Sequence, residues 1–169
     1  MLTDRLYFKQ LLSGEDFAKG DMIATQMRNF AYLIGDRETG DAVVVDPAYA
    51  AGELVDTLEA DGMRLSGVLV THHHPDHVGG TMMGFTLKGL AELLEREQVP
   101  VHVNIHEAKW VSRVTGIPLT DLTDHEHGDL ARCNLVEQRE HLPHRLTDAQ
   151  KTVLAGLDPE SARKLANAA

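Results

Sequence analysis

The chain has 169 residues, and its 16 basic and 26 acidic side chains give a formal net charge of −10 at pH 7. This acidity argues against nucleic acids and anionic membranes as partners, because both attract basic surfaces. A single cysteine, Cys133, excludes an intrachain disulfide and favours a reducing cytoplasm. Met1–Leu12 lacks the apolar core of a signal peptide, and no apolar run approaches the roughly 18 residues of a membrane-spanning helix.

The first part of the chain alternates between strand and helix patterns. Short apolar runs predict strands, and an apolar stripe at helical spacing predicts a helix. The predicted strands are Leu6–Leu11, Phe30–Ile34, Ala42–Val45 and Leu65–Thr71, and the predicted helix is Ala50–Ala60. Because strand, helix and strand in this order form a right-handed crossover, we expect Ala42–Val45 and Leu65–Thr71 to be neighbours in one sheet.

The same signals continue toward the C-terminus. The predicted elements there are a helix at Thr86–Gln98, a strand at Val101–Asn104, a helix at His106–Thr115 closed by Gly116, a polar loop at Thr120–Asp129, and two short helices after Thr147. We expect Trp110 to be a core residue and His125 to be exposed in the polar loop. The alternation of strands and helices predicts an α/β fold, α+β in some schemes.

The segment Thr71–His77 carries the strongest chemical signal, because four of the ten histidines lie between positions 72 and 77. Imidazole and carboxylate groups are ligands of zinc, iron and similar ions. In an extended segment, His72 and His74 point the same way and His73 the other. Asp76, after Pro75, is expected to be an N-cap. A solvated loop or an affinity tag is the alternative, but a tag lies at a terminus and lacks the interleaved Pro and Asp.

These residues resemble a known family. The pattern His72-x-His74-x-Asp76-His77 after a buried strand is similar to the HxHxDH signature of the metallo-β-lactamase superfamily. Ala42–Pro47 and Asn29–Ile34 resemble two preceding strands of that family, and the resemblance runs from about Leu6 to about Leu130. The nearest branch in appearance is that of glyoxalase II-like and persulfide dioxygenase-like proteins. The resemblance implies the N-terminal half of an αββα sandwich.

The resemblance also implies roles for individual side chains. His72 and His74 would bind one metal ion, and Asp76 and His77 a second. Asp46 would orient the ligands by hydrogen bonds without touching the metal, although a turn residue before proline is an equal explanation of it. Thr71 would hydrogen-bond the loop, although a threonine at a strand end needs no functional reason.

The C-terminal part departs from the family pattern. His141-Leu142-Pro143-His144 only echoes the family's later histidine segment, so His144 is a candidate ligand, and no histidine follows it. We therefore expect an incomplete metallo-β-lactamase-like domain at residues 1–133 and an atypical helical tail at residues 134–169. The second half of the sandwich is expected to be lost through truncation or a frameshift, or replaced by this tail.

The resemblance implies three alternative functions. The first is a metal-dependent hydrolase of small thioesters or esters that uses a metal-activated water, with one or two zinc ions and with Asp76 orienting the water. The second is an iron-dependent sulfur dioxygenase, and the third is a non-catalytic metal-binding remnant. A small molecule is the expected partner, and an exposed sheet edge would favour a homo-oligomer.

Overall fold

A computed structural model describes residues 5–126 of the chain. The strands are β1 (Leu6–Leu12), β2 (Phe30–Asp36), β3 (Asp41–Val45), β4 (Arg64–Val70), β5 (Gly80–Met82), β6 (Phe85–Leu87), β7 (Val101–Asn104) and β8 (Leu122–His125). The helices are α1 (Met22–Met27), α2 (Ala51–Ala60), α3 (Pro75–Val78), α4 (Leu90–Arg96) and α5 (Ile105–Thr115), with a 3-10 turn at Leu119–Asp121. Cys133, His144, the predicted tail helices and the predicted boundary after residue 133 lie outside the described residues.

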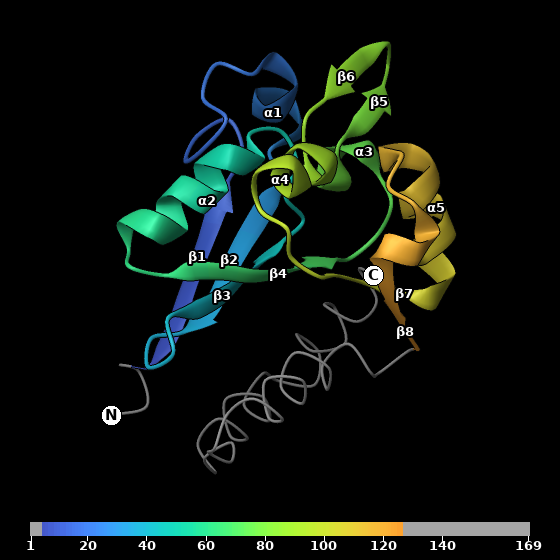
Figure 1. The fold of residues 1–169 in the computed structure, drawn as a ribbon. Coiled ribbons are helices and arrows are strands. Elements are labelled where there is room, and N and C mark those ends of the chain that lie inside the picture. The colour runs from blue at the N-terminus through green and yellow to red at the C-terminus, as the bar shows by residue number, and fades with distance from the viewer. Residues whose placement is uncertain (1–4, 127–169) are drawn as a thin grey trace, which may run out of the picture.

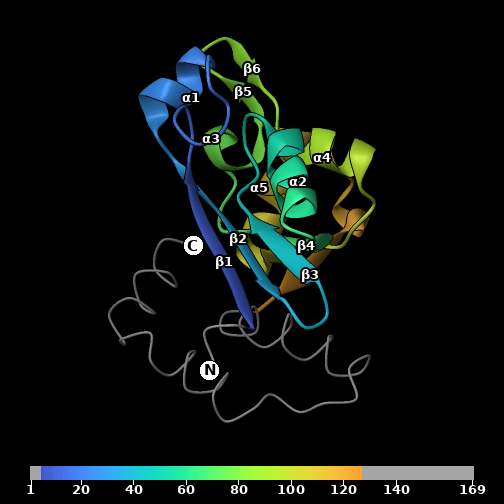
Figure 2. The same cartoon turned by 90° about the vertical axis from the view of Figure 1, so that its left-hand side faces the viewer.

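Six of the described strands form one mixed sheet in the order β1-β2-β3-β4-β7-β8, and β5 and β6 form a separate hairpin (Figure 1). β1, β2 and β3 pair antiparallel, whereas β3, β4, β7 and β8 pair parallel. Parallel strands end at the same edge of a sheet, so the loops after β3, β4 and β7 leave from one side. The hairpin and α1 lie at the same end of the molecule in two perpendicular views (Figure 1, Figure 2).

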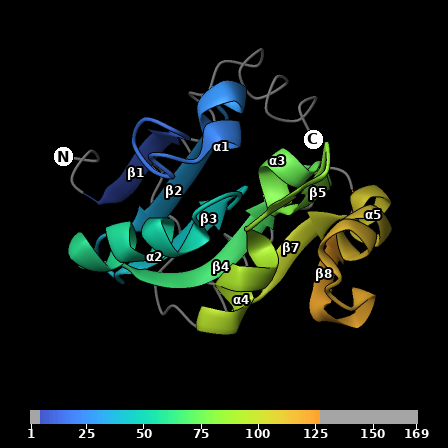
Figure 3. The same cartoon turned by 90° about the horizontal axis from the view of Figure 1, so that it is seen from above.

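One apolar core holds the sheet and helices together. Val44, Val68 and Val101 lie side by side on β3, β4 and β7, and each is at most 1% exposed. Viewed from above, α2 and α4 run along one side of the sheet, and α5 lies beside β7 and β8 (Figure 3). Leu54 of α2 and Val111 of α5 are fully buried in the same core cluster. Burial of such side chains contributes about 1.5–3 kcal/mol each, so the core fixes the edge from which the loops emerge.

The antiparallel strands β1 and β2 bury every second residue. Tyr7 and Leu33 are fully buried, whereas Phe8 is 52% exposed and Phe30 is 42% exposed. Tyr32 contacts both phenylalanines, with ring centroids 6.1 Å and 6.3 Å away. One face of this part of the sheet therefore packs on the core, and the other presents aromatic side chains.

The predicted α/β class is confirmed, and the predicted strands and helices between Leu6 and Thr115 match the structure closely, apart from the start of α4. The predicted crossover is also confirmed, because β3 and β4 are parallel neighbours. No helix in the described part of the chain is long and apolar enough to cross a membrane.

Two predictions of secondary structure are wrong. Residues 85–87 form β6 instead of the start of a helix, because Gly89 packs against Gly79 and the helix begins only at Leu90. The predicted polar loop holds β8, because Leu122 is buried and pairs with Val101 of β7. Tertiary pairing thus overrides a polar composition in this segment.

The two other errors concern single side chains. Trp110 is 38% exposed instead of being a core residue, since Ala108 and Val111 face the core from α5. His125 is 9% exposed instead of lying in an exposed loop, because it belongs to β8. Position on a helix face or in a strand, rather than residue type, decides burial in both cases.

Candidate metal centre

The histidine-rich segment follows β4 at the edge where the parallel strands end. Its residues run extended through His74, and Pro75 then starts the one-turn helix α3. His74, with φ −63° and ψ 139°, is the N-cap, so the expected assignment of Asp76 as N-cap is wrong. Proline at the first helical position explains this, because its fixed φ suits N1 and it needs no hydrogen-bond acceptor. Asp76 and His77 thus leave the backbone from a helical turn, at a different angle from His72.

Asp46, just after β3, is the hydrogen-bond acceptor at the centre of the site. Its backbone is left-handed, with φ 54°, and its side chain is 7% exposed. Oδ1 accepts from the Thr71 backbone N–H at 2.9 Å, and Oδ2 accepts from the Thr71 hydroxyl at 2.6 Å. A non-glycine residue in this conformation is costly and needs surrounding support. The two hydrogen bonds with Thr71 supply this support and join the end of β3 to the end of β4, next to the histidines.

His77 is held between two partners. Its Nδ1 lies 3.0 Å from Asp46 Oδ2, and its Nε2 lies 2.9 Å from Asn29 Nδ2. Asn29 Nδ2 also donates to Asp76 Oδ2 at 2.8 Å and to the Asp76 carbonyl at 3.3 Å. Because an ionised carboxylate only accepts, Asn29 must present its NH₂ group, and His77 Nε2 is then the acceptor. The Nδ1 of His77 therefore carries the proton that it donates to Asp46.

The same reasoning fixes the tautomer of His72. Its Nδ1 lies 3.0 Å from the Thr71 hydroxyl oxygen, whose proton is already donated to Asp46. His72 Nδ1 must therefore carry a proton and donate it to Thr71, which leaves His72 Nε2 as an acceptor. That Nε2 lies 3.1 Å from His74 Nδ1. Four side chains thus form one directed chain of hydrogen bonds that runs from His74 through His72 and Thr71 to Asp46.

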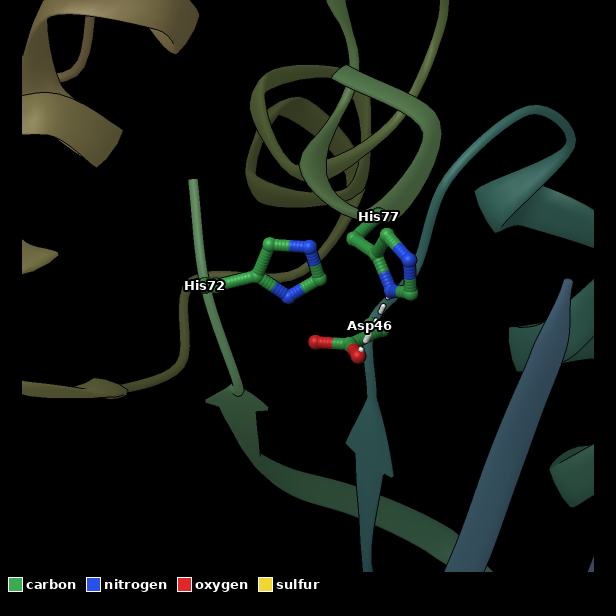
Figure 4. Close-up of side chains that lie close together, drawn as sticks. All are labelled: Asp46, His72 and His77. Carbon is green, nitrogen blue, oxygen red and sulfur yellow. Dashed lines mark hydrogen bonds and ion pairs between the residues drawn. The ribbon is translucent and has the colours of Figure 1, made fainter. Parts of the chain in front are cut away.

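This arrangement fits a divalent metal ion. Asp46, His72 and His77 each offer an atom within 4.8 Å of the others, and their side chains converge on one space (Figure 4). The carboxylate of Asp46 is buried and already accepts three hydrogen bonds, so it suits an orienting role better than direct ligation. Metal-binding histidines characteristically donate their second ring N–H to an oxygen. His72 and His77 both do so, and each keeps Nε2 as the lone-pair nitrogen.

Burial and neighbouring charges shift the pKa values of His72 and His77 in opposite directions. Burial, followed by the charges of His77 and His74, lowers the pKa of His72 despite Asp46 and Asp76. Burial also lowers the pKa of His77, but the hydrogen bond and charge of Asp46 and the charge of Asp76 outweigh it and raise that pKa. A histidine must be neutral to bind a metal ion. As the pH falls, His72 therefore stays neutral to a lower pH than His77 does.

His73 points to the opposite side of the segment. The Glu107 carboxylate accepts from the His73 backbone N–H at 2.9 Å and from His73 Nδ1 at 2.6 Å. Burial raises the pKa of Glu107, but the hydrogen bonds and charge of His73 outweigh it and lower that pKa. The ring of Trp110 lies 5.9 Å from that of His73. α5 therefore supports the segment from outside, without contributing to the metal-binding group.

Several residues at the site carry no role in the sequence analysis. Asn29 precedes a strand and Glu107 lies within a helix, and no local sequence signal indicates the contact of either with the segment. Tyr49 is a third such residue, with φ 66° and an exposed fraction of 3%. Burial, and then the charges of Asp76 and Asp21, raise the pKa of its hydroxyl. That hydroxyl has no hydrogen-bond partner in the part of the chain that the structure describes.

Among residues 5–126, the other histidines lie outside the group formed by Asp46, His72 and His77. His102 on β7 and His125 on β8 are both buried, with His102 Nδ1 and His125 Nε2 2.9 Å apart. His106 is exposed at the start of α5. His74 and Asp76 are hydrogen-bonded to members of the group or to its partner Asn29 but fall outside the set within 4.8 Å. His144 lies outside the described residues.

Comparison with known proteins identifies relatives of the chain. A hydroxyacylglutathione hydrolase from Bradyrhizobium sp. (strain ORS 278) is 56% identical over 52 residues, which are 31% of this chain and 20% of that protein. One from Rhodopseudomonas palustris (strain BisB5) is 38% identical over 104 residues, 62% of this chain and 34% of that protein. The matches thus span about a fifth and about a third of these relatives' own length.

Among solved structures, ETHE1 from Myxococcus xanthus is 28% identical, with a TM-score of 0.41 over 59% of this chain and 36% of that chain. The sequence model of the Metallo-beta-lactamase superfamily matches residues 24–154, which is more than half of the chain. This range contains the whole histidine-rich segment together with Asp46 and Asn29. The chain therefore belongs to the metallo-beta-lactamase superfamily and holds part of its fold.

Proposed function

We propose that this protein is a metal-dependent hydrolase of small thioesters of the hydroxyacylglutathione type. One observation carries the proposal: His77 donates its Nδ1 proton to the Asp46 carboxylate and His72 donates its Nδ1 proton to the Thr71 hydroxyl, so both rings present an unprotonated Nε2. The curated relatives named hydroxyacylglutathione hydrolase support the substrate class, although they match this chain over only part of their length.

The proposed ligands are His72, His74, Asp76 and His77, and zinc is the proposed metal, as one or two ions. When bound, such an ion lowers the pKa of a coordinated water toward 7 and polarises the thioester carbonyl. Asp46 and Thr71 would hold the imidazoles in the required tautomer and orientation. His144 stays a candidate further ligand.

Asp76 is the proposed catalytic residue. Its side chain is 12% exposed, and Oδ2 is held by Asn29 at 2.8 Å. A carboxylate fixed in this way, beside the proposed ligand His77, can accept the proton of an attacking water. A reducing, cytoplasmic setting belongs to the same proposal, supported by the single cysteine of the chain.

The test combines metal binding with hydrolysis. The protein is stripped with a chelator, zinc is titrated back against a chromophoric competitor, and cleavage of a hydroxyacyl thioester of glutathione is followed. We expect His77→Ala to abolish hydrolysis and to weaken zinc binding at least about tenfold, because one imidazole ligand is lost. His106→Ala is the matched control, since this exposed histidine lies outside the ligand group.

Two results would contradict the proposal. Hydrolysis that survives His77→Ala would remove this segment from the reaction. Bound iron, with oxygen uptake in the presence of a glutathione persulfide and no thioester cleavage, would replace the hydrolase by a sulfur dioxygenase.

A further inference from the structure

The outer side of α5 combines an exposed aromatic ring with two cations. Trp110 is 38% exposed, the Lys109 Nζ lies 4.7 Å from its ring centroid, and the Arg113 Cζ lies 5.9 Å from it. We call these three residues the α5 patch. Cations over an indole face attract the ring quadrupole, so the patch is a defined arrangement instead of three independent side chains.

The two cations of the α5 patch stand out in an acidic protein. Most of the described basic side chains, such as Arg5, Arg64 and Arg96, pair with a carboxylate. Lys109 and Arg113 have no carboxylate oxygen within 4.0 Å among residues 5–126. Glu107 is on the same helix, but its carboxylate is taken by His73. The patch is therefore a local excess of positive charge on a chain with a net charge of −10.

The α5 patch is directly connected to the proposed metal-binding segment. The ring of Trp110 lies 5.9 Å from that of His73, and the ring of His73 lies 5.1 Å from that of His74. Glu107 fixes this connection, because it holds both the backbone and the ring of His73. The ring of Trp110 and the ring of the proposed ligand His74 are therefore both neighbours of the His73 ring.

We infer that the α5 patch binds the carboxylate end of an extended, small acidic substrate while the other end reaches the metal-binding segment. A guanidinium and an ammonium group offer charge-assisted hydrogen bonds to a carboxylate, and the exposed part of the indole ring offers an apolar contact to the rest of the molecule. This inference rests on the proposed function, since thioesters of glutathione-like thiols carry carboxylates at a distance from the scissile carbonyl.

Trp110 is the only tryptophan of the chain, so its fluorescence reports directly on the α5 patch. The experiment titrates the chelator-treated, full-length protein with S-methylglutathione and, separately, with its diethyl ester, in which both carboxylates are blocked. We expect a saturable change with the acid and none with the ester. Because no metal takes part, this readout is independent of whether the protein hydrolyses thioesters.

The variants Lys109→Gln and Arg113→Gln are each expected to raise the dissociation constant about threefold to fivefold, the range of an exposed ion pair. Arg64→Gln is the matched control, because it removes one exposed cation at the opposite end of β4 and should leave the constant unchanged. Three outcomes would overturn the inference: no saturable change, equal weakening by Arg64→Gln, or equal affinity for inorganic phosphate at the same ionic strength.

Discussion

Asp46 accepts a hydrogen bond from Nδ1 of His77 at 3.0 Å, although 31 residues separate the two in sequence. The same carboxylate accepts two bonds from Thr71, so it fixes both ends of the histidine-rich segment. We predict that Asp46→Asn weakens zinc binding about tenfold to a hundredfold, because the His77 ring loses its anionic acceptor. Competition with a chromophoric chelator at pH 7 measures the zinc affinity of both proteins.

Asp41→Asn is the control for that experiment. Asp41 lies at the other end of β3 and pairs with Arg64 near the surface. Its removal changes the net charge equally but should leave the zinc affinity within about twofold of the wild-type value. An Asp46→Asn variant that binds zinc as tightly as Asp41→Asn would show that the carboxylate does not orient the ligands.

Asn29 provides a second prediction, because its amide bonds both Asp76 and His77. Asn29→Ala should lower the free energy of unfolding by about 1–2 kcal/mol through the loss of these bonds. Asn29→Asp should lower it further, because it places a second carboxylate about where the amide lies, close to Asp76. Urea denaturation at pH 7 in the presence of chelator compares the two, and equal stability would contradict the assigned hydrogen bonds.

Sequence reasoning could single out the histidine-rich segment as a candidate metal site but not the residues that support it. His72, His74, Asp76 and His77 are close together in the chain, and a strand before a proline-interrupted turn is a local signal. The contacts of Asn29 with His77 and of Glu107 with His73 join residues 48 and 34 positions apart. Such contacts depend on how β2 and α5 pack, and no residue pattern near either partner encodes that.

His73 is proposed to be a structural histidine, in contrast to its neighbour His72, which is a proposed ligand. His73→Ala should leave zinc stoichiometry unchanged, because its ring is bonded to Glu107 on the side away from the ligand group. It should still lower the free energy of unfolding by about 1–2 kcal/mol, since a charge-assisted bond is lost. Elemental analysis and thermal denaturation of His73→Ala and His72→Ala make the comparison. Loss of zinc in both variants would contradict the division of roles.

Gly89 lets α4 start directly against the helix that carries Asp76 and His77. A Cβ atom at position 89 would lie 2.6 Å from the Val78 carbonyl oxygen and 2.7 Å from the Gly79 nitrogen. Gly89→Ala should therefore destabilise the protein by about 1–3 kcal/mol through backbone displacement. Gly52 lies within α2, and a Cβ atom there would have the Arg96 side chain as its nearest neighbour outside the helix, at 3.7 Å; Gly52→Ala should therefore stabilise the protein by about 0.5–1 kcal/mol. Chemical denaturation of both variants measures the free energy of unfolding, which should fall for Gly89→Ala and rise for Gly52→Ala.

Asp36 should contribute to stability in a pH-dependent way. Burial raises the pKa of Asp36, but its hydrogen bonds with Arg5 and nearby backbone groups outweigh burial and hold that pKa below its ordinary value of 3.8. Folding therefore favours the ionised carboxylate. Its contribution is complete above about pH 4 and is lost as the pH falls through the lowered pKa.

Asp36→Asn should therefore lower the free energy of unfolding at pH 7 by about 1–2 kcal/mol, and the difference from wild type should shrink toward about pH 2. Glu38→Gln is the control, because Glu38 also pairs with Arg5 but its side chain is 60% exposed. A difference that stays constant between these pH values would show that the Asp36 carboxylate is not stabilised by folding.

The directed hydrogen bonds that end on Asp46 couple metal binding to folding. A short peptide of residues 71–78 would hold the same imidazoles, but only pairing of β3 with β4 brings Asp46 to them. Each tenfold by which the folded protein binds zinc more tightly than that peptide can add about 1.4 kcal/mol to the stability of the sheet at saturating zinc. Zinc would then act as a folding ligand as well as the proposed catalytic ion, and the chelated protein should refold to a less stable sheet.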